Sequence, residues 1–287
     1  MINLENLLVK RNNIKDLNPL IHCITNPISI NNCANIILST GASPIMAEHP
    51  LEVSEITTSS NALLLNLGNI TDQRMDSMEI SAAIANKNNI PIVLDLVGVS
   101  CSFLRLTFAK KLLDNYKFNI IKGNMSEIKS IYLNEKSSIG IDVSNEDKIN
   151  VNNLENYIYI SKSLSNKYNS TILISGKIDI ITDKNISYTN ENGVEELSNI
   201  TGTGCMLGAL CASFLSSYNS FESAILATLL LNISGEVSSF SKGPGSFLLH
   251  LMDNIYSLDN LEIIKKAKLL EYKEDNYVWF KFIFYYK

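Results

Sequence analysis

The sequence predicts an α/β fold in three layers, with a mostly parallel central sheet covered by helices on both faces. Two observations predict this fold. Short runs of apolar residues recur along the chain, and amphipathic helical patterns lie between most of them. The runs are apolar throughout and do not alternate with polar residues, which is typical of strands that are buried on both faces of a parallel sheet.

The alternation is clearest before residue 183. The apolar runs predict five strands, at Ala62–Leu67, Ile90–Val97, Phe118–Ile121, Thr171–Ile174 and Ile178–Thr182. The helical patterns predict four helices, at Ile30–Leu38, Gln73–Asn86, Phe103–Leu113 and Ser126–Leu133. A strand, a helix and a second strand in succession are the unit from which parallel sheets are built.

The pattern changes in the last third of the chain. The elements expected there are a strand near Ile186–Tyr188, a turn at Gly193, and helices at about Cys205–Tyr218, Phe221–Phe240 and from Gly243-Pro244-Gly245-Ser246 to Tyr256. Since no linker divides the chain, residues 1–264 are expected to form one domain. Residues 265–287 are charged and then aromatic, and we expect an atypical tail that is either an appended strand or a disordered end.

Charge and composition exclude two classes of partner. The formal net charge is −5, and lysine and arginine form no cluster before the last turns of the chain. A phosphate backbone needs such a cluster, so we expect no nucleic acid partner. No apolar run approaches the roughly 18 residues of a membrane span, and the first residues lack the apolar core of a signal peptide. We therefore expect no membrane partner.

The cysteines predict the compartment. Their number is five, which is odd, and no two of them form a C-x-x-C pair. This pattern indicates reduced thiols and neither a disulfide framework nor a zinc site. We expect a cytoplasmic protein.

The segment Gly202-Thr203-Gly204-Cys205 is the first candidate for a binding site. Glycines let backbone N–H groups approach a ligand, and the first turn of a helix adds unpaired N–H groups and the positive end of its dipole. Together these features favour an anion such as phosphate. The alternative is a tight turn in which Thr203 caps a buried helix. No G-K-[ST] follows, so the segment is not a Walker loop.

Cys205 is the candidate catalytic residue. It lies in the first turn of the helix, where the dipole is expected to lower the thiol pKa and favour the thiolate. A thiolate there could accept a proton from a substrate hydroxyl beside a bound phosphate. Cys211, further along the same apolar helix, is expected to be a small core residue.

Two acidic positions follow predicted strands. Asp95 lies at the carboxyl end of one strand, which is where open α/β folds bind ligands. The alternative is that Asp95 is only a polar loop residue or a helix cap. Asn124 and Glu127 follow the next strand. Their spacing predicts a capping box, in which Asn124 caps the helix and Glu127 reaches back to it. A cap at this edge of the sheet also faces the cleft, so Glu127 could lie near a magnesium ion as well.

At this point the sequence resembles the hydroxyethylthiazole kinase family. The motifs that carry the resemblance are Leu20-Ile21-His22-Cys23-Ile24-Thr25-Asn26, Thr40-Gly41-Ala42-Ser43-Pro44-Ile45-Met46-Ala47, Thr201-Gly202-Thr203-Gly204-Cys205 and Gly243-Pro244-Gly245-Ser246-Phe247. They occur in the family's order and cover roughly residues 18–256. The resemblance implies a ribokinase-like fold, a homotrimer with sites near subunit interfaces, and transfer of the ATP γ-phosphate to the hydroxyl of the thiazole alcohol 4-methyl-5-(2-hydroxyethyl)thiazole in thiamine biosynthesis or salvage.

The resemblance also implies roles for individual residues. The residues that it places at the thiazole are Met46, Gly202 and Asn26. Those that it places at ATP are Lys122, Ser175, Gly204 and Asn124. Cys205 takes the position at which sugar kinases of this fold carry aspartate, and Asp95 and Glu127 are the candidate Mg²⁺ ligands. His22 and His49 are expected to have no catalytic role.

The chain departs from the family's usual motifs in three places. The family's D-P-V-G-A-G is here Asp95-Leu96-Val97-Gly98-Val99-Ser100. Its arginine before Gly-Asn is Lys122, which keeps the charge and loses the bidentate geometry on phosphate. Its threonine before Gly is Ser175, which keeps the hydroxyl. We expect altered nucleotide affinity and retained activity.

The sequence leaves two alternative functions to be considered. A pyrimidine or pyridoxal kinase would keep the fold and change the alcohol, but those relatives usually carry aspartate at the position of Cys205. A catalytically silent protein that binds thiazole or nucleotide would belong to a different class. The presence of Asp95, Lys122 and Glu127 together with the glycine turn argues against it.

Overall fold

The computed structural model describes residues 2–135 and 153–273, and within them one mixed sheet runs through the molecule. Its strands follow the order β2-β1-β3-β4-β5-β6-β7-β8-β9. Their bounds are β1 Leu20–Ile24, β2 Ser43–Ile45, β3 Ala62–Asn66, β4 Ile92–Asp95, β5 Ile120–Asn124, β6 Thr171–Ser175, β7 Asp179–Asp183, β8 Ile186–Asn190 and β9 Leu269–Glu271. The pairings from β2 to β6 are parallel, and those from β6 to β9 are antiparallel.

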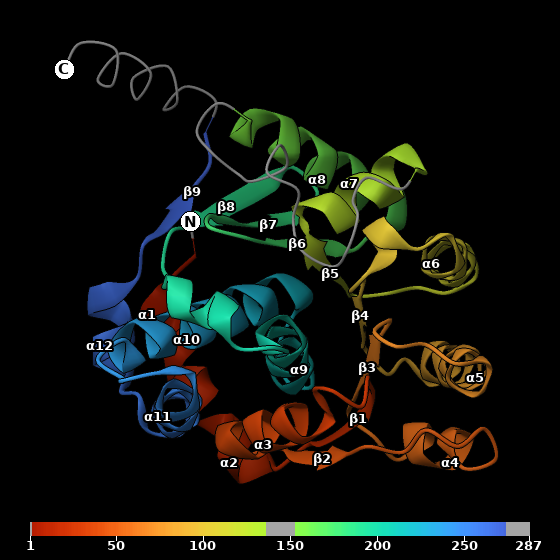
Figure 1. Cartoon of the computed structure of the whole chain (residues 1–287), viewed down its shortest axis with the longest axis horizontal. Helices are drawn as coiled ribbons and strands as arrows, with labels where there is room; N and C mark the ends of the chain where they lie inside the picture. Colours follow the sequence, from red (N-terminus) through yellow and green to blue (C-terminus); the bar gives the residue numbers. More distant parts are fainter. Residues whose placement is uncertain (1, 136–152, 274–287) are drawn as a thin grey trace.

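Helices cover both faces of this sheet, so the predicted three-layer α/β/α fold is confirmed (Figure 1). On one face lie α4 Val53–Thr58, α5 Asp72–Asn88, α6 Phe103–Asn115, α7 Met125–Leu133 and α8 Leu154–Tyr168. On the other lie α1 Leu4–Arg11, α2 Asn13–Leu17, α3 Ile30–Thr40, α9 Thr203–Leu215, α10 Ser220–Ser238, α11 Pro244–Ser257 and α12 Asn260–Lys266.

The central strands β3 and β4 are apolar until their last residues. β3, for example, is fully buried and reads Ala-Leu-Leu-Leu-Asn, because helices on both faces remove its side chains from water. The register then sets the terminal polar residues side by side. Asn66 pairs with Asp95, Asp95 pairs with Lys122, and Asn124 pairs with Ser175. A row of polar groups therefore lies along the carboxyl edge of the sheet.

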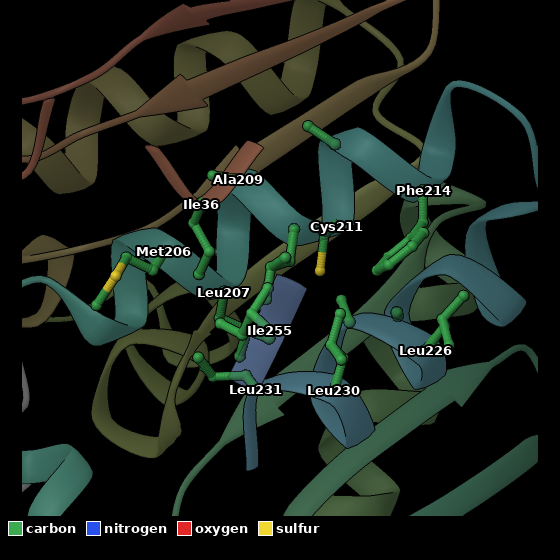
Figure 2. Close-up of a cluster of buried hydrophobic side chains, with 14 of the residues drawn as sticks. Ile36, Met206, Leu207, Ala209, Cys211, Phe214, Leu226, Leu230, Leu231 and Ile255 are labelled. Carbon is green, nitrogen blue, oxygen red and sulfur yellow. The ribbon is translucent and has the colours of Figure 1, made fainter. Parts of the chain in front are cut away.

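Two apolar clusters fill the space on either side of the sheet. Figure 2 shows the larger one, where side chains of α9 and α10 point toward one another. Cys211 lies among them near Phe214 and Leu230 and is fully buried, and burial raises the pKa of its thiol to about 12. The expectation that Cys211 is a core residue is confirmed.

The predicted strands and helices are all present, with ends that shift by a few residues. The sequence pattern missed the helices α1, α2, α4, α8 and α12, the strand β1 and the short edge strand β2. α8 is amphipathic, but Tyr, Ser and Lys interrupt its apolar stripe, and an edge strand of three residues has no periodicity to detect.

The proposed boundary between domain and tail falls inside α12, which continues to Lys266. The chain then forms β9, which pairs antiparallel with β8. β9 lies in the segment for which an appended strand was one of the two expectations, and residues 274–287 lie outside the described residues. In the part of the chain that the structure describes, no helix has the length and apolarity of a membrane span.

Candidate active site

A buried ion pair lies at the centre of the polar row. Lys122 Nζ is 3.1 Å from Asp95 Oδ1, and both side chains are almost fully buried. Burial raises the pKa of Asp95, while Lys122 and Asn66 oppose the rise. Removing one partner of such a pair leaves an uncompensated buried charge, which costs about 3–5 kcal/mol. Asp95 and Lys122 therefore depend on each other.

Asn66 connects Asp95 to the neighbouring strand. Its Oδ1 accepts a hydrogen bond from the backbone N–H of Gly68 at 2.9 Å, so its Nδ2 must be the group that faces Asp95 Oδ2, at 2.8 Å. The sequence interpretation did not include Asn66. The available signal was a single polar residue at the end of an otherwise apolar strand.

Asn26 continues the chain of hydrogen bonds to the thiol. Its Oδ1 accepts from the backbone N–H groups of Ile28 and Ser29, both at 3.1 Å. Its Nδ2 therefore donates, to Asn66 Oδ1 at 3.1 Å and to Cys205 Sγ at 3.3 Å. A continuous path thus joins Asp95, Asn66, Asn26 and Cys205, which come from three strand ends and the first turn of α9.

The glycine turn opens α9 as predicted. Gly202 has φ +86°, a conformation that favours glycine, and an added Cβ would lie 2.9 Å from Ser29 Cβ. No side chain caps the helix. The alternative in which Thr203 is the cap is wrong, because Thr203 is the first helical residue and its hydroxyl donates to the Leu197 carbonyl at 2.9 Å. The helix N-terminus is thus free of a side-chain cap, as an anion site requires.

The same turn approaches the ion pair. A methyl group placed on Gly204 would lie 3.8 Å from Lys122 Nζ, and one placed on Gly208 would lie 3.2 Å from Asp95 Oδ2. Small residues on this side of α9 therefore let the helix pass close to both charges. The glycine turn, the ion pair and Cys205 form a single site.

The expected effect of the helix dipole on Cys205 is wrong. Burial raises the pKa of the thiol above its ordinary value, and the negative charge of Asp95 raises it further. Ser29 and Lys122 oppose the rise without reversing it. A helix dipole stabilises a nearby anion by only about 0.3–1 kcal/mol, whereas burial disfavours the charged form more strongly. Cys205 is consequently a neutral thiol at neutral pH in the ligand-free protein.

The predicted capping box at α7 is confirmed. Asn124 Oδ1 accepts from the Glu127 N–H at 2.9 Å, and Glu127 Oε2 accepts from the Asn124 N–H at 2.7 Å. Glu127 Oε1 also accepts from the N–H of Gly98 at 2.7 Å, in the loop where the chain departs from the family motif. Burial and the charge of Asp95 raise the pKa of Glu127 to about 7. The residue is therefore a helix cap whose buried carboxylate interacts electrostatically with Asp95.

The two carboxylates fit a magnesium ion. The described residues contain no group of three or more His, Cys, Asp or Glu side chains that could hold a metal. Mg²⁺ does not need one, because it usually takes one or two carboxylates and completes its shell with phosphate oxygens and water. Asp95 and Glu127 raise each other's electrostatic energy, and a cation near both would remove that repulsion.

Ser175 ends β6 next to Asn124, and its hydroxyl donates to the Gly123 carbonyl at 3.5 Å. The turn after it is held by Asp179, a buried residue that the sequence interpretation missed. Asp179 Oδ1 accepts from the Gly176 N–H at 2.9 Å, and burial raises its pKa to about 6. The hydroxyl of Ser175 thus lies on a fixed turn at the carboxyl edge.

Met46 follows the edge strand β2. Its side chain is half-buried and packs against the apolar cluster that contains Cys205. His22 is fully buried under the same segment, and His49 is exposed.

Comparison with solved structures defines the class. A ribokinase-like superfamily protein from Enterococcus faecalis matches 85% of this chain and 90% of its own with a TM-score of 0.61. Its sequence identity of 13% makes this a likeness of fold alone. The chain therefore has a ribokinase-like fold.

More similar proteins define the family. The family model "Hydroxyethylthiazole kinase family" matches residues 12–261. Hydroxyethylthiazole kinase 2 from Clostridium botulinum (strain Langeland) is 53% identical over 262 residues, which cover 91% of this chain and 99% of the relative. The structure of hydroxyethylthiazole kinase from Pyrococcus horikoshii OT3 matches 94% of this chain and all of its own with a TM-score of 0.85 and 27% identity. The chain belongs to the hydroxyethylthiazole kinase family.

Proposed function

We propose that this enzyme transfers the γ-phosphate of ATP to the hydroxyl of the thiazole alcohol. The observation that carries the proposal is the path Asp95–Asn66–Asn26–Cys205, which runs from a buried ion pair to a thiol beside an uncapped helix N-terminus. The path supports a site with a nucleotide side, near Asp95 and Lys122, and an alcohol side, near Cys205. The family's named relatives support the choice of alcohol.

Each side has its own proposed contacts. The nucleotide contacts are Lys122, Ser175, Gly204 and Asn124, and the alcohol contacts are Met46, Gly202 and Asn26. Backbone N–H groups of the glycine turn stabilise the charge that develops on the transferred phosphoryl group. Asp95 and Glu127 would hold Mg²⁺, which would neutralise charge on the phosphate oxygens.

The proton of the alcohol moves to Cys205 Sγ as the alcohol oxygen forms its bond to the γ-phosphorus. The bond from the γ-phosphorus to the bridging oxygen breaks, and ADP leaves with that oxygen. Cys205 must be ionised to accept the proton, although its pKa is raised in the ligand-free protein. The charge of Asp95 is one cause of that rise, and Mg²⁺ held at Asp95 would offset this charge.

A coupled ADP-release assay tests the proposed substrate. We expect turnover with the thiazole alcohol and little with hydroxymethylpyrimidine or pyridoxal. Faster turnover with either rival would assign the chain to a related alcohol kinase. Binding of the thiazole alcohol without ADP release from any of the three would support the silent binding protein.

Lys122→Ala is expected to raise the KM for ATP about ten-fold and to leave the KM for the thiazole alcohol nearly unchanged, because the lost charge faces phosphate. The variant also leaves Asp95 without its partner, so its folded fraction is measured by circular dichroism. Lys122→Arg is the matched control and is expected to raise the KM for ATP much less than Lys122→Ala does, or to lower it, because the charge is kept. A change confined to the thiazole KM would contradict the assignment of Lys122 to the nucleotide side.

We infer that the protein is a cytoplasmic homotrimer. All five cysteines are free thiols, which supports a reducing compartment. Light scattering is expected to give three times the mass of one chain, and activity is expected to fall on dilution, because the sites lie near subunit boundaries. A fully active monomer would contradict the trimer.

A further inference from the structure

The imidazole of His22 lies beneath the chain segment that carries Met46. His22 belongs to β1, is fully buried, and pairs with Ile45, the last residue of β2. Its Nε2 is 2.9 Å from the carbonyl oxygen of Ala47, and its Nδ1 is 3.0 Å from Thr57 Oγ1 on α4. The two contacts extend the link between β1 and β2 two residues beyond the last paired position.

The two contacts fix the protonation of the ring. A carbonyl oxygen can only accept, so Nε2 carries the hydrogen and donates it to Ala47. Burial lowers the pKa of His22, which keeps the ring neutral, and Nδ1 then accepts from the hydroxyl of Thr57. His22 is thus a neutral residue with one donor, and that donor is directed at the Met46 segment.

Contacts from α5, on the same face of the sheet as α4, hold the next residue of the segment, Glu48. Ser77 on α5 donates to the Glu48 carbonyl at 2.8 Å. Arg74, also on α5, forms an ion pair with the Glu48 carboxylate at 2.7 Å and donates to the Asn69 carbonyl at 2.7 Å. The backbone at Ala47 and Glu48 is therefore tied to the α4 and α5 side of the sheet, while Met46 packs against the cluster on the α9 side.

We propose that His22 is a positioning residue for the alcohol substrate, because its Nε2–H holds the Ala47 carbonyl and thereby sets the place of Met46. This proposal rests on the proposed contact between Met46 and the thiazole alcohol. β2 is an edge strand of only three residues, with a strand neighbour on one side of the described sheet, so backbone pairing alone holds its end weakly. The hydrogen bond from His22 supplies the missing restraint.

Two substitutions distinguish the effect of losing the N–H donor from the effect of losing the imidazole ring. In His22→Gln, the side-chain amide N–H reaches about as far as the imidazole Nε2 and can still donate to Ala47. In His22→Asn, the amide is one bond shorter and loses that contact. We expect His22→Asn to raise the KM for the thiazole alcohol about ten-fold, with kcat and the KM for ATP within about three-fold of wild type, as for the loss of uniform binding. His22→Gln is expected to stay within about three-fold in all three constants.

A second readout does not depend on turnover. The concentration of thiazole alcohol that gives half of the maximal shift in Tm, without ATP, should rise in His22→Asn and not in His22→Gln. Thr182→Val removes a buried hydroxyl between Ser161 and Ser187 and is the control for a general loss of stability. It should lower Tm without changing the KM for the thiazole alcohol or the concentration that gives half of the maximal Tm shift. If His22→Asn does not fold, Ser77→Ala removes the second anchor of the segment and should change the alcohol KM in the same direction.

The results distinguish this proposal from the proposed function. If wild type turns over the thiazole alcohol and the two variants His22→Asn and His22→Gln have the same KM for it, the positioning role alone is overturned. An equal rise in the KM for ATP and for the alcohol would also overturn it. Absence of turnover by wild type with the thiazole alcohol would overturn the proposed function and the positioning role together.

Discussion

Replacing Cys205 with alanine is expected to lower kcat by about ten- to a thousand-fold, the usual range for the loss of a general base. Activity should not vanish, because positioning of the two substrates and charge neutralisation by the metal and the backbone amides remain. Cys205→Ser should resemble the alanine variant, since a hydroxyl has the shape without the basicity.

Cys205→Asp gives the opposite expectation. An aspartate would hold its carboxylate where Asn26 Nδ2 already donates to Cys205 Sγ, and it would be ionised over a wider range of pH than the thiol. This variant should therefore remain active, and an increase in kcat above wild type is the expected direction. The measurement is kcat for all three variants, with circular dichroism to confirm that each is folded.

Cys211→Ala is the matched control for this series. Cys211 lies further along α9 and is fully buried in the apolar core. Its loss should cost about 1 kcal/mol of stability through a small cavity and should leave kcat unchanged. An alanine variant at position 205 that matches wild type, together with an inactive aspartate variant, would make Cys205 a packing residue and leave the glycine turn as the whole site.

Glu127→Gln is expected to lower kcat by about ten-fold or more, because it removes a charge from the proposed metal site. The variant also has a structural cost. Both carboxylate oxygens accept from backbone N–H groups, of Gly98 and Asn124, and an amide –NH₂ would face one of these donors. Such a mismatch costs about 1–3 kcal/mol. The measurement is kcat as a function of Mg²⁺ concentration, corrected for the folded fraction.

Glu236→Gln controls for the loss of a carboxylate charge outside the proposed site. Glu236 also accepts from a backbone N–H, that of Gly193 at 3.0 Å, and it lies outside the proposed site. The hydrogen bonds of Glu236 all reach Oε1, so the glutamine can keep them, and this variant should keep its kcat, its Mg²⁺ dependence and most of its stability. If Glu127→Gln behaves in the same way as Glu236→Gln, Glu127 is a helix cap alone.

The pH dependence of stability gives a further test of Glu127. Its folded pKa of about 7 lies above the ordinary value of 4.5, so the folded state binds more protons than the unfolded state between these values. The contribution of Glu127 to the free energy of unfolding should therefore fall as pH rises from about 4.5 to 7. Ligand-free wild type should show this fall, and the difference between wild type and Glu127→Gln should isolate it.

Much of the fold could be predicted because its signals are local. The apolar runs mark the buried strands, and the residue that ends each run marks the carboxyl edge of the sheet. Asp95 was found in this way, and the spacing of Asn124 and Glu127 correctly predicted the capping box. These inferences need only residue order and the geometry of parallel strands.

The contacts between strand ends could not be predicted in the same way. Asn66 lies next to Asp95 because of the register of β3 and β4, which a single sequence does not reveal. The close packing of α9 against the strand ends at Gly208 brings Asp95 near Cys205, where its charge raises the pKa of the thiol against the effect of the helix dipole. The edge strand β2, whose end His22 holds, is too short to show a pattern. In each case the decisive interaction joins residues far apart in the chain.

The most direct test of the account follows the transferred phosphate itself. Phosphorus NMR of wild type with Mg²⁺, ATP and the thiazole alcohol should show a new phosphate ester that accumulates in equal amount with ADP. The ester signal should grow at least as fast with Cys205→Asp and at least about ten-fold more slowly with Cys205→Ala. Formation of ADP with inorganic phosphate and unchanged alcohol, or an ester signal that is independent of residue 205, would contradict the account.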